Sequence, residues 1–430
     1  MTRSLVFLAA LSLVETGFGG CGADRERDAG APDVTTDGDV MPDVDGDGPT
    51  PDGAADAGTD ADTEHDDADG LPPPVAMELV EVPHDRLGLD CGPGCQQLTF
   101  AEEAILYEVG ESYLLYSVSG PGYRAPLYLV SLETLQEYKM DPCEEYWCGS
   151  PGIDGSTVVY PTARWAEDPP LMTVWRYHIG DPSRFALVER QMTEYTMPLG
   201  AVYIHGDLIA WVDSAIPLVG VYVMDINERE VIDITPSIHC PCYGEPRLFG
   251  REVIFDYFGP GSGYSNMDIL RVNVDTLEQE NLTSSMDVPS AQFDPAFDGQ
   301  WVVWTDGRND PSYDPYGERV NPDIYGMELA TRVVEPLCDH PAVQLYPDVR
   351  DGLVAWDDLR NAEDPNDNRY TANWDIYLLD LDTRREVQVT SLPGSERGAQ
   401  IWGRRVFFYS TDLIGQGAIF MVDLDEAGLL

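Results

Sequence analysis

Residues 294–392 carry nearly the same pattern twice. The first copy reads DPAFDGQWVVWTDGRND over 294–310 and PDIYGMELATRVVEPL over 322–337. The second reads YPDVRDGLVAWDDLRN over 346–361 and WDIYLLDLDTRREVQVT over 374–390. In both copies a proline precedes a tryptophan by 9 residues, and that tryptophan precedes an Asp-Ile-Tyr segment by 19. An internal repeat of this kind constrains the architecture of the whole chain.

An aromatic anchor, preceded by two mostly apolar residues, recurs along the rest of the sequence. The seven anchors are Tyr116, Tyr160, Trp211, Phe255, Trp304, Trp356 and Phe408. They are separated by 44, 51, 44, 49, 52 and 52 residues, and in four repeats a proline stands nine residues earlier. Seven copies of one supersecondary unit are therefore expected.

Each unit reads as short β-strands. Runs such as LYLVSLET, VYVMDI and DIYLLDL alternate apolar and polar residues and are bounded by Gly, Pro, Asp and Asn, whereas no long helical period occurs. Units of about 45–50 residues with four strands each are typical of a β-propeller, in which packing around an axis covers the sheet faces. We predict an all-β, seven-bladed propeller over residues 76–430. Six blades is the alternative if the second repeat is irregular.

The repeats resemble those of the TolB-like propeller family, which read approximately D-G-x-x-V-x-[WF]-x-[SD] followed by D-I-Y-x-x-D-x. Repeats five and six match over most of this length, whereas repeats one to three match at the anchor and the following strand. The resemblance covers about residues 96–430 and implies a propeller. The α/β domain that precedes the propeller in the Tol protein has no counterpart here, so the Tol role does not carry over directly.

The two ends of the repeat region predict how the ring closes. The seventh repeat stops after FMVDLDEAGLL and lacks an outer strand, whereas residues 96–99 (QQLT) resemble residues 388–390 of the sixth repeat. We expect Leu98 to pair beside the strand at 419–422, so that the N-terminal strand completes the last blade and removes an exposed sheet edge.

The first 20 residues read as an export signal. Arg3 precedes an apolar run at 5–14 that is too short to span a bilayer as a mature helix, and small residues precede Cys21. The segment FGGC at 18–21 resembles a bacterial lipobox, which implies lipidation of Cys21 and a cell-envelope location, on the outer membrane or cell surface and on its periplasmic or extracellular side. Cleavage near Gly19 without lipidation is the alternative.

Residues 21–75 are rich in Asp, Gly, Ala, Pro and Thr, and we predict a disordered tether. Residues 24–70 hold 17 carboxylates and two arginines, and the whole chain carries a net charge of −52. Such charge excludes nucleic acid as a partner and opposes contact with anionic lipid, so only the lipid anchor should reach the membrane. We expect a monomer.

Two long, adjacent loops, residues 306–322 and 357–373, are the candidate binding surface. Aromatic, acidic and arginine side chains mix there, as suits a peptide or a sugar, although a solvated loop without a ligand would have the same composition. The candidate binding residues are Asp306, Arg308, Tyr313, Asp314, Tyr316 and Arg319 in the first loop, and Asp358, Arg360, Asp364, Asp367, Arg369 and Tyr370 in the second.

Both loops begin with W-x-D-x-R-N, which has a structural and a functional interpretation. A turn held by an Asp–Arg pair is favoured, because a catalytic site is rarely built twice. Oxygen ligands for Ca²⁺ are available, but their spacing does not establish a site, and no cofactor or metal is predicted. The possible ligand sets are Asp306, Asp310 and Asp314, or Asp358, Asp364 and Asp367.

The cysteines predict a disulfide-bonded, exported protein. Cys91–Cys95 and Cys143–Cys148 are plausible local bridges. Cys240 and Cys242 are too close to pair easily, so Cys338 is the natural partner of one of them. A Cys/His metal site is the alternative, and its candidate ligands are His239, Cys240, Cys242, Cys338 and His340.

The sequence contains no G-x-S-x-G, H-E-x-x-H or phosphate-binding loop, so no catalytic residue is predicted. The favoured function is a lipid-anchored propeller that binds an envelope protein or glycan. The alternative is an enzyme acting on polysaccharide or peptide at the mouth of the central channel. Convergent His, Arg and carboxylate groups at the axis would favour the enzyme, and a broad aromatic patch on repeats five and six would favour the binder.

Overall fold

The computed structural model describes most of the chain from residue 71 onward, and every regular element in that part is a β-strand. None of the described residues forms a helix long and apolar enough to cross a membrane. The signal segment, Cys21 and the tether up to residue 70 lie outside the described residues. The described ranges are 71–83, 88–100, 103–118, 125–140, 147–164, 167–192, 201–213, 220–235, 244–258, 267–284, 290–309, 321–362, 372–411 and 417–430.

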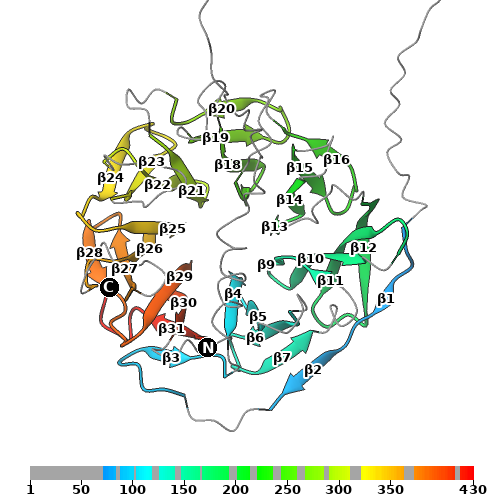
Figure 1. Ribbon diagram of the computed structural model, residues 1–430, viewed down its shortest axis with the longest axis horizontal. Coiled ribbons are helices and arrows are strands. Elements are labelled where there is room, and N and C mark those ends of the chain that lie inside the picture. Colours follow the sequence, from blue (N-terminus) through cyan, green and yellow to red (C-terminus); the bar gives the residue numbers. More distant parts are fainter. Residues whose placement is uncertain are drawn as a thin grey trace, which may run out of the picture.

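Seven antiparallel sheets stand around a ring, so the predicted seven-bladed propeller is confirmed (Figure 1). Blade one holds β4 (Ala104–Val109), β5 (Tyr113–Val118), β6 (Leu127–Ser131) and β7 (Glu137–Met140). Blade two holds β8 (Trp147–Cys148), β9 (Gly152–Asp154), β10 (Thr157–Arg164), β11 (Leu171–His178) and β12 (Ser183–Gln191). Blade three holds β13 (Val202–His205), β14 (Leu208–Asp213), β15 (Gly220–Asp225) and β16 (Val231–Asp233).

The other four blades repeat this order. Blade four holds β17 (Arg247–Phe249), β18 (Glu252–Phe258), β19 (Met267–Asn273) and β20 (Gln279–Asn281). Blade five holds β21 (Gln292–Phe297), β22 (Trp301–Asp306), β23 (Asp323–Glu328) and β24 (Val334–Cys338). Blade six holds β25 (Gln344–Arg350), β26 (Leu353–Asp358), β27 (Asp375–Asp380) and β28 (Arg385–Gln388). Blade seven holds β29 (Ser395–Trp402), β30 (Arg405–Thr411), β31 (Gly417–Asp423) and the N-terminal β3 (Cys95–Gln97).

Two strands that the repeat pattern does not predict lie outside blades one and two. β1 (Val75–Ala76) pairs with β12, and β2 (Leu79–Val82) pairs with β7 (Figure 1). Both are antiparallel to their neighbours and cover the outer edges of these two blades. The sequence missed them because they are short and lie before the first aromatic anchor, where no repeat marks them.

The seven aromatic anchors are all buried, in the second strand of each blade. Hydrophobic clusters fill each seam between neighbouring blades, for example the cluster of Val354, Trp356 and Val303 between blades five and six. In most blades the anchor also faces an aromatic residue on the third strand, as in the stacked Trp356–Tyr377 pair, whose centroids lie 6.4 Å apart. The anchors are therefore the core residues that hold each blade against the next.

In blades five and six, the proline nine residues before the anchor marks a bulge in the innermost strand. The register of β21 shifts between Phe293 and Ala296, and that of β25 shifts between Leu345 and Asp348. The residue before each proline, Asp294 or Tyr346, has a positive φ of 52° or 54°. Proline lacks a backbone donor and so tolerates a bulge, where a ladder hydrogen bond is already lost.

The N-terminal strand closes the ring as predicted. Gln96 and Gln97 pair with Met421 and Phe420 on β31, and the amide of Leu98 donates to the carbonyl of Ile419 at 2.8 Å. The resemblance of QQLT to the end of blade six has a physical cause. Threonine hydroxyls accept the amide of the third strand in both blades, Thr99 from Ile419 at 2.9 Å and Thr390 from Ile376 at 2.8 Å.

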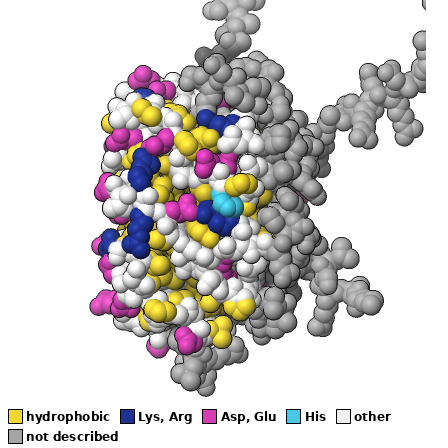
Figure 2. Space-filling view, turned by 90° about the vertical axis from the view of Figure 1, so that its left-hand side faces the viewer, with side chains coloured by type: hydrophobic (Ala, Val, Ile, Leu, Met, Phe, Trp, Pro, Cys, Tyr) yellow, Lys and Arg dark blue, Asp and Glu magenta, His cyan; other side chains and the backbone are white. Residues whose placement is uncertain are grey.

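Charged side chains cover the rim of the ring. Figure 2 views the side that carries β24 and β28, where acidic and basic side chains are interspersed with hydrophobic ones. Ion pairs link neighbouring blades there, Arg384 with Glu335 and Arg332 with Glu280. Exposed outer strands with charged side chains are protected against edge-to-edge pairing with another chain.

Replacement of an anchor should test the packing of the seams. We expect Trp356→Ala to lower the free energy of unfolding by about 3–5 kcal/mol, because a fully buried large aromatic side chain is lost. Urea unfolding followed by circular dichroism gives the measurement. Val333→Ala, at a side chain that is 59% exposed, is the control and should change stability by less than about 0.5 kcal/mol. Equal effects of the two substitutions would contradict the assignment of Trp356 as an anchor.

Candidate functional site

The structure describes four of the twelve predicted binding residues. Asp306 and Asp358 are the last residues of β22 and β26, and Arg308 and Arg360 follow two residues later at the beginnings of the two long loops. The other eight, together with the calcium candidate Asp310, lie outside the described residues, so their role remains a prediction. These eight are Tyr313, Asp314, Tyr316, Arg319, Asp364, Asp367, Arg369 and Tyr370.

In blade five, W-x-D-x-R-N forms a saturated polar cluster at the base of the loop. The indole nitrogen of Trp304 donates to Oδ2 of Asp306 at 2.8 Å. Arg308 donates to both carboxylate oxygens of Asp306, from Nε at 2.9 Å and from Nη2 at 2.7 Å. Its guanidinium also lies 3.9 Å from the ring centroid of Tyr325. The Asp306 carboxylate is fully buried, and the bonds that it accepts stabilise the turn at the beginning of the loop.

Blade six repeats this cluster. Trp356 Nε1 and Arg360 Nη2 both donate to Oδ2 of Asp358, at 2.9 Å and 2.7 Å. The Arg360 guanidinium lies 3.9 Å from the Tyr377 ring centroid, and it also contacts Glu386. These are the contacts of a turn held by an Asp–Arg pair, as the structural interpretation of the motif requires.

The asparagine of each motif joins the two ends of its loop. Asn309 Nδ2 donates to Oδ2 of Asp323 at 2.7 Å, and Asn361 Nδ2 donates to Oδ2 of Asp375 at 2.9 Å. Asn361 also donates to the Tyr377 hydroxyl at 2.8 Å. We call these two groups the loop clamps. They fix the positions at which each long loop leaves and re-enters the ring.

A second group of residues, most of them polar, lines the innermost strands, and the prediction based on the loops did not include it. All seven hairpins between the first and second strands have two-residue turns, so equivalent positions can be counted back from the anchors. The residues eight before each anchor form an inner ring: Glu108, Gly152, Tyr203, Arg247, Ala296, Asp348 and Gln400. Those six before each anchor form a mouth ring: Gly110, Asp154, His205, Phe249, Asp298, Arg350 and Trp402.

Inner-ring side chains bond to the next blade. Glu108 accepts the amide of Ile153 at 3.1 Å, and Asp348 accepts the amide of Ile401 at 2.7 Å. Gln400 donates to the carbonyl of Tyr107 at 2.8 Å, across the seam between blades seven and one. Because the same contact recurs at different seams, these groups have a structural role as links between blades.

Charges also interact across the axis. Burial raises the pKa of Glu108 to about 7, and the Ile153 amide and the positive charges of Arg247 and Arg350 oppose the rise. Arg247 comes from blade four and Arg350 from blade six, so charges from separate parts of the ring act on Glu108. Burial likewise raises the pKa of Asp348, opposed by the Ile401 amide and then by the same two arginines.

The mouth ring is partly exposed and mixes aromatic and charged groups. Asp154 accepts the amide of Gly206 at 2.5 Å, and His205 stacks on Phe249 with centroids 4.7 Å apart. Arg350 lies 3.8 Å from the ring centroid of Trp402. Burial lowers the pKa of His205, while Asp154 opposes this effect. His, Arg and carboxylate groups thus converge at the axis, at the end opposite the long loops.

No group of three or more His, Cys, Asp or Glu side chains within the described ranges is arranged to hold a metal ion. Of the proposed Cys/His ligands, Cys338 and His340 are described, whereas His239, Cys240 and Cys242 are not. The arrangement of the described residues therefore gives no support to a metal centre.

The cysteine predictions have mixed outcomes. The Cys91–Cys95 disulfide is confirmed. Cys148 is disulfide-bonded, and Cys143 lies outside the described residues. The predicted bridge from Cys338 is wrong, because Cys338 is a free, buried thiol that accepts a hydrogen bond from Arg360 at 3.1 Å. Burial raises the pKa of this thiol to about 12.

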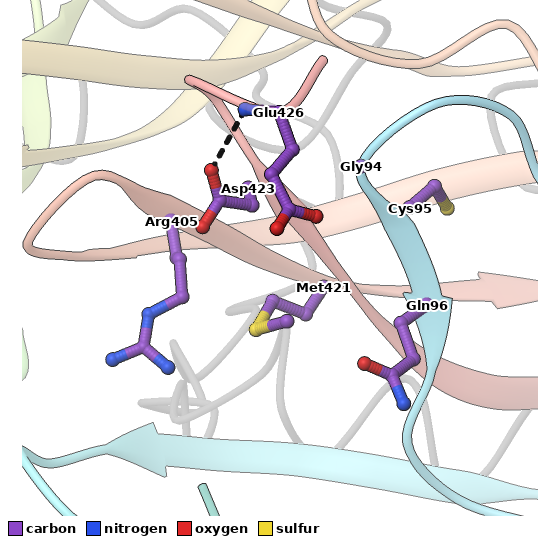
Figure 3. Close-up of a pocket in the computed structure, with 7 residues that line it drawn as sticks. All are labelled: Gly94, Cys95, Gln96, Arg405, Met421, Asp423 and Glu426. Atoms are coloured by element: carbon purple, nitrogen blue, oxygen red, sulfur yellow. Dashed lines mark hydrogen bonds between the residues drawn. The ribbon is translucent and has the colours of Figure 1, made fainter. Parts of the chain in front are cut away.

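A shallow pocket of about 380 Å³ lies beside the closing strand β3 (Figure 3). Arg405 and Met421 from β30 and β31 line it together with Gln96 from β3. Asp423 accepts the amide of Glu426 at 3.0 Å, which closes the turn at its edge. The charged side chains in its lining are those of Arg405, Asp423 and Glu426.

Comparisons with known proteins establish the fold. No protein-family model and no curated protein matches the sequence. Among solved structures, oligogalacturonate lyase from Vibrio parahaemolyticus is similar with a TM-score of 0.54 and 14% identity, covering 82% of this chain and 98% of that one. The propeller domain of the Trilobed protease from Pyrococcus furiosus has a TM-score of 0.53 and 12% identity, covering 76% of this chain and 95% of that one.

A putative TolB from Agrobacterium tumefaciens is also similar, with a TM-score of 0.41 and 12% identity, covering 70% of this chain and 98% of that one. This similarity is too weak to carry an argument, and the propeller expected from the TolB-like repeat is confirmed by the seven sheets of the structure itself. The Pyrococcus domain is described as having an open velcro topology, whereas β3 closes the ring here. At these identities the similarity shows the fold and not an activity.

Removal of a loop clamp should be measurable. We expect Asn361→Ala and Asn309→Ala each to lower the free energy of unfolding by about 1–3 kcal/mol, because a buried carboxylate loses a donor. Denaturant unfolding of the full chain checks this. Asn227→Ala in the exposed turn after β15 is the matched control, expected within about 0.5 kcal/mol of the wild type. A clamp variant as stable as the control would show that the clamp contributes nothing.

Proposed function

We propose that this chain is a monomeric, lipid-anchored cell-envelope propeller that binds a protein or glycan partner through the long loops of blades five and six. The observation that carries the proposal is the pair of loop clamps. Two neighbouring blades each hold a long loop at its base through a buried carboxylate, an arginine and an asparagine. A rigid base under two adjacent loops is the usual construction of a binding surface.

The convergence of His, Arg and carboxylate groups at the axis favours an enzyme, whereas the contacts that the carboxylates make there favour a binding module. The carboxylates of Glu108, Asp154 and Asp348 each accept a backbone amide, and those of Glu108 and Asp348 also interact with Arg247 and Arg350. Carboxylates used in this way stabilise the ring. The anchoring part of the proposal rests on the sequence around Cys21 and on the tether that follows it.

The binding surface can be tested by loop replacement. Residues 310–320 and 363–371 would be exchanged for Gly/Ser linkers in the full-length chain, and binding partners captured from envelope extract by crosslinking. We expect the wild type to capture a partner that the double replacement loses. Replacement of residues 259–266, the corresponding connection in blade four, is the matched control and should retain it. A partner retained by the double replacement would contradict the assignment of the surface.

The anchor has its own test. Cells grown with a labelled fatty acid should incorporate label into the wild-type protein and not into Cys21→Ser, because acylation requires the thiol. The variant should also leave the membrane fraction. Labelling that persists in the Cys21→Ser variant would exclude a lipid on this residue.

An enzyme remains the second candidate, and one observation favours it. Glu108 has a pKa raised to about 7 and lies near two arginines at the axis, as suits a general acid or base at neutral pH. Incubation of the purified chain with acidic polysaccharides or peptides, with Glu108→Gln as control, tests this. We expect no turnover by either protein. Turnover by the wild type that Glu108→Gln abolishes would establish the enzyme instead.

A further inference from the structure

Blade seven differs from blades five and six at one buried position. The first strand of each blade carries a residue 12 before the anchor: Gln292 in blade five, Gln344 in blade six and Glu396 in blade seven. All three are buried, with exposed fractions of 2%, 0% and 0%. A neutral amide thus occupies this site twice, and a carboxyl group replaces it at the seam between blades six and seven.

Glu396 packs directly against blade six. Its backbone amide donates to the carbonyl of Trp374 at 2.8 Å, which places it beside Asp375. Its Oε1 accepts the Ser410 hydroxyl at 3.0 Å, and its Oε2 accepts the Leu392 amide at 3.2 Å. Glu396 and the 1% exposed Asp375 are thus two acidic residues buried at the same seam, and the negative charge of Asp375 acts on the Glu396 carboxyl group. We call them the buried acidic pair.

The charges on the surrounding strands do not neutralise this pair. On β26, Asp358 adds a further negative charge near Asp375, and its own cation is Arg360. On β29, Arg397 contacts Asp357 on β26. Neutral donors complete the surroundings: Asn361 toward Asp375, and Ser410 and Thr390 toward Glu396.

The pKa values agree with this geometry. Burial raises the pKa of Glu396 to about 7, and the negative charge of Asp375 adds to the rise. Burial also raises the pKa of Asp375, which Asn361 opposes. In the protonated state, Glu396 is neutral and close in shape to the glutamine at the equivalent positions, with one O–H donor where the amide has two N–H donors.

We propose that Glu396 and Asp375 hold a proton between them in the closed ring, and that its release loosens the seam between blades six and seven. Asn361 of the blade-six clamp donates a hydrogen bond to Asp375. Loss of the proton therefore also weakens the clamp at the base of the blade-six loop. The seam is thus a pH-dependent joint beside the blade that closes the ring. This inference is independent of the partner that the loops bind.

The sign of the effect follows from linkage. The folded state binds the proton more tightly than the unfolded chain, in which a glutamate has its ordinary pKa of about 4.5. This contribution to stability is complete below about pH 4.5 and is lost as the pH rises through about 7. The folding equilibrium should change on the order of 100-fold from this site between pH 5 and pH 8.

The test compares the thermal stability of the full chain with that of Glu396→Gln from pH 5 to pH 8. We expect equal melting temperatures at pH 5, and at pH 8 a higher one for Glu396→Gln, because the amide keeps the neutral state. Asp375→Asn, which removes the other charge, should flatten the pH dependence in the same way. Gln344→Glu, which places a carboxyl group beside Asp323, is the matched converse and should steepen it.

Parallel curves for the wild type, Glu396→Gln and Asp375→Asn across this range would overturn the proposal. A direct reading comes from carbon-13 NMR of glutamate-labelled protein. We expect one carboxyl resonance, absent in Glu396→Gln, that titrates near pH 7. A Glu396 resonance that titrates near 4.5 would equally overturn it.

Discussion

The structure depends on the main-chain hydrogen bonds that join residues 95–99 to residues 419–423. A ring of seven blades has one seam at which the two ends of the chain must meet. Here the N-terminal β3 supplies the outer strand of blade seven, and Leu98 and Thr99 bond to Ile419. The Cys91–Cys95 disulfide lies at the start of this strand. Closure fixes the angular position of every blade, and therefore of the loops and axial side chains that the blades carry.

Within the closed ring, two sets of polar contacts have different roles. The inner ring links each blade to the next through backbone amides, as Glu108 and Asp348 do. The loop clamps act within a blade and hold the bases of the long loops. Both sets bury carboxylates in a strongly acidic chain, and each carboxylate is satisfied by a donor or an arginine. Asp375 of the blade-six clamp differs from the others because a second buried acidic residue, Glu396, lies at the same seam, and this is where we place a proton.

The sequence predicted the fold well because its signal is repeated. The anchor is a buried aromatic in all seven blades. The proline marks a bulge in blades five and six, and the threonine of QQLT accepts a strand amide as its counterpart in blade six does. The strands β1 and β2 were not predicted because they belong to no repeat. The inner ring and the mouth ring were not predicted because their residues differ from blade to blade, as Glu108, Tyr203 and Arg247 do. Only their spacing from the anchor is constant. The predicted disulfide of Cys338 was wrong because the spacing of cysteines in the sequence does not show which of them are buried.

The central claim is that the N-terminal strand is an integral part of blade seven. Hydrogen exchange of the full-length protein, resolved to peptides that cover residues 95–99 and 417–423, tests it most directly. The account predicts that both segments exchange slowly and together, at the rate of the buried second strands, because opening one exposes the other. Rapid exchange of residues 95–99 with continued protection of the second strands would contradict it and would mean that the ring closes without this strand.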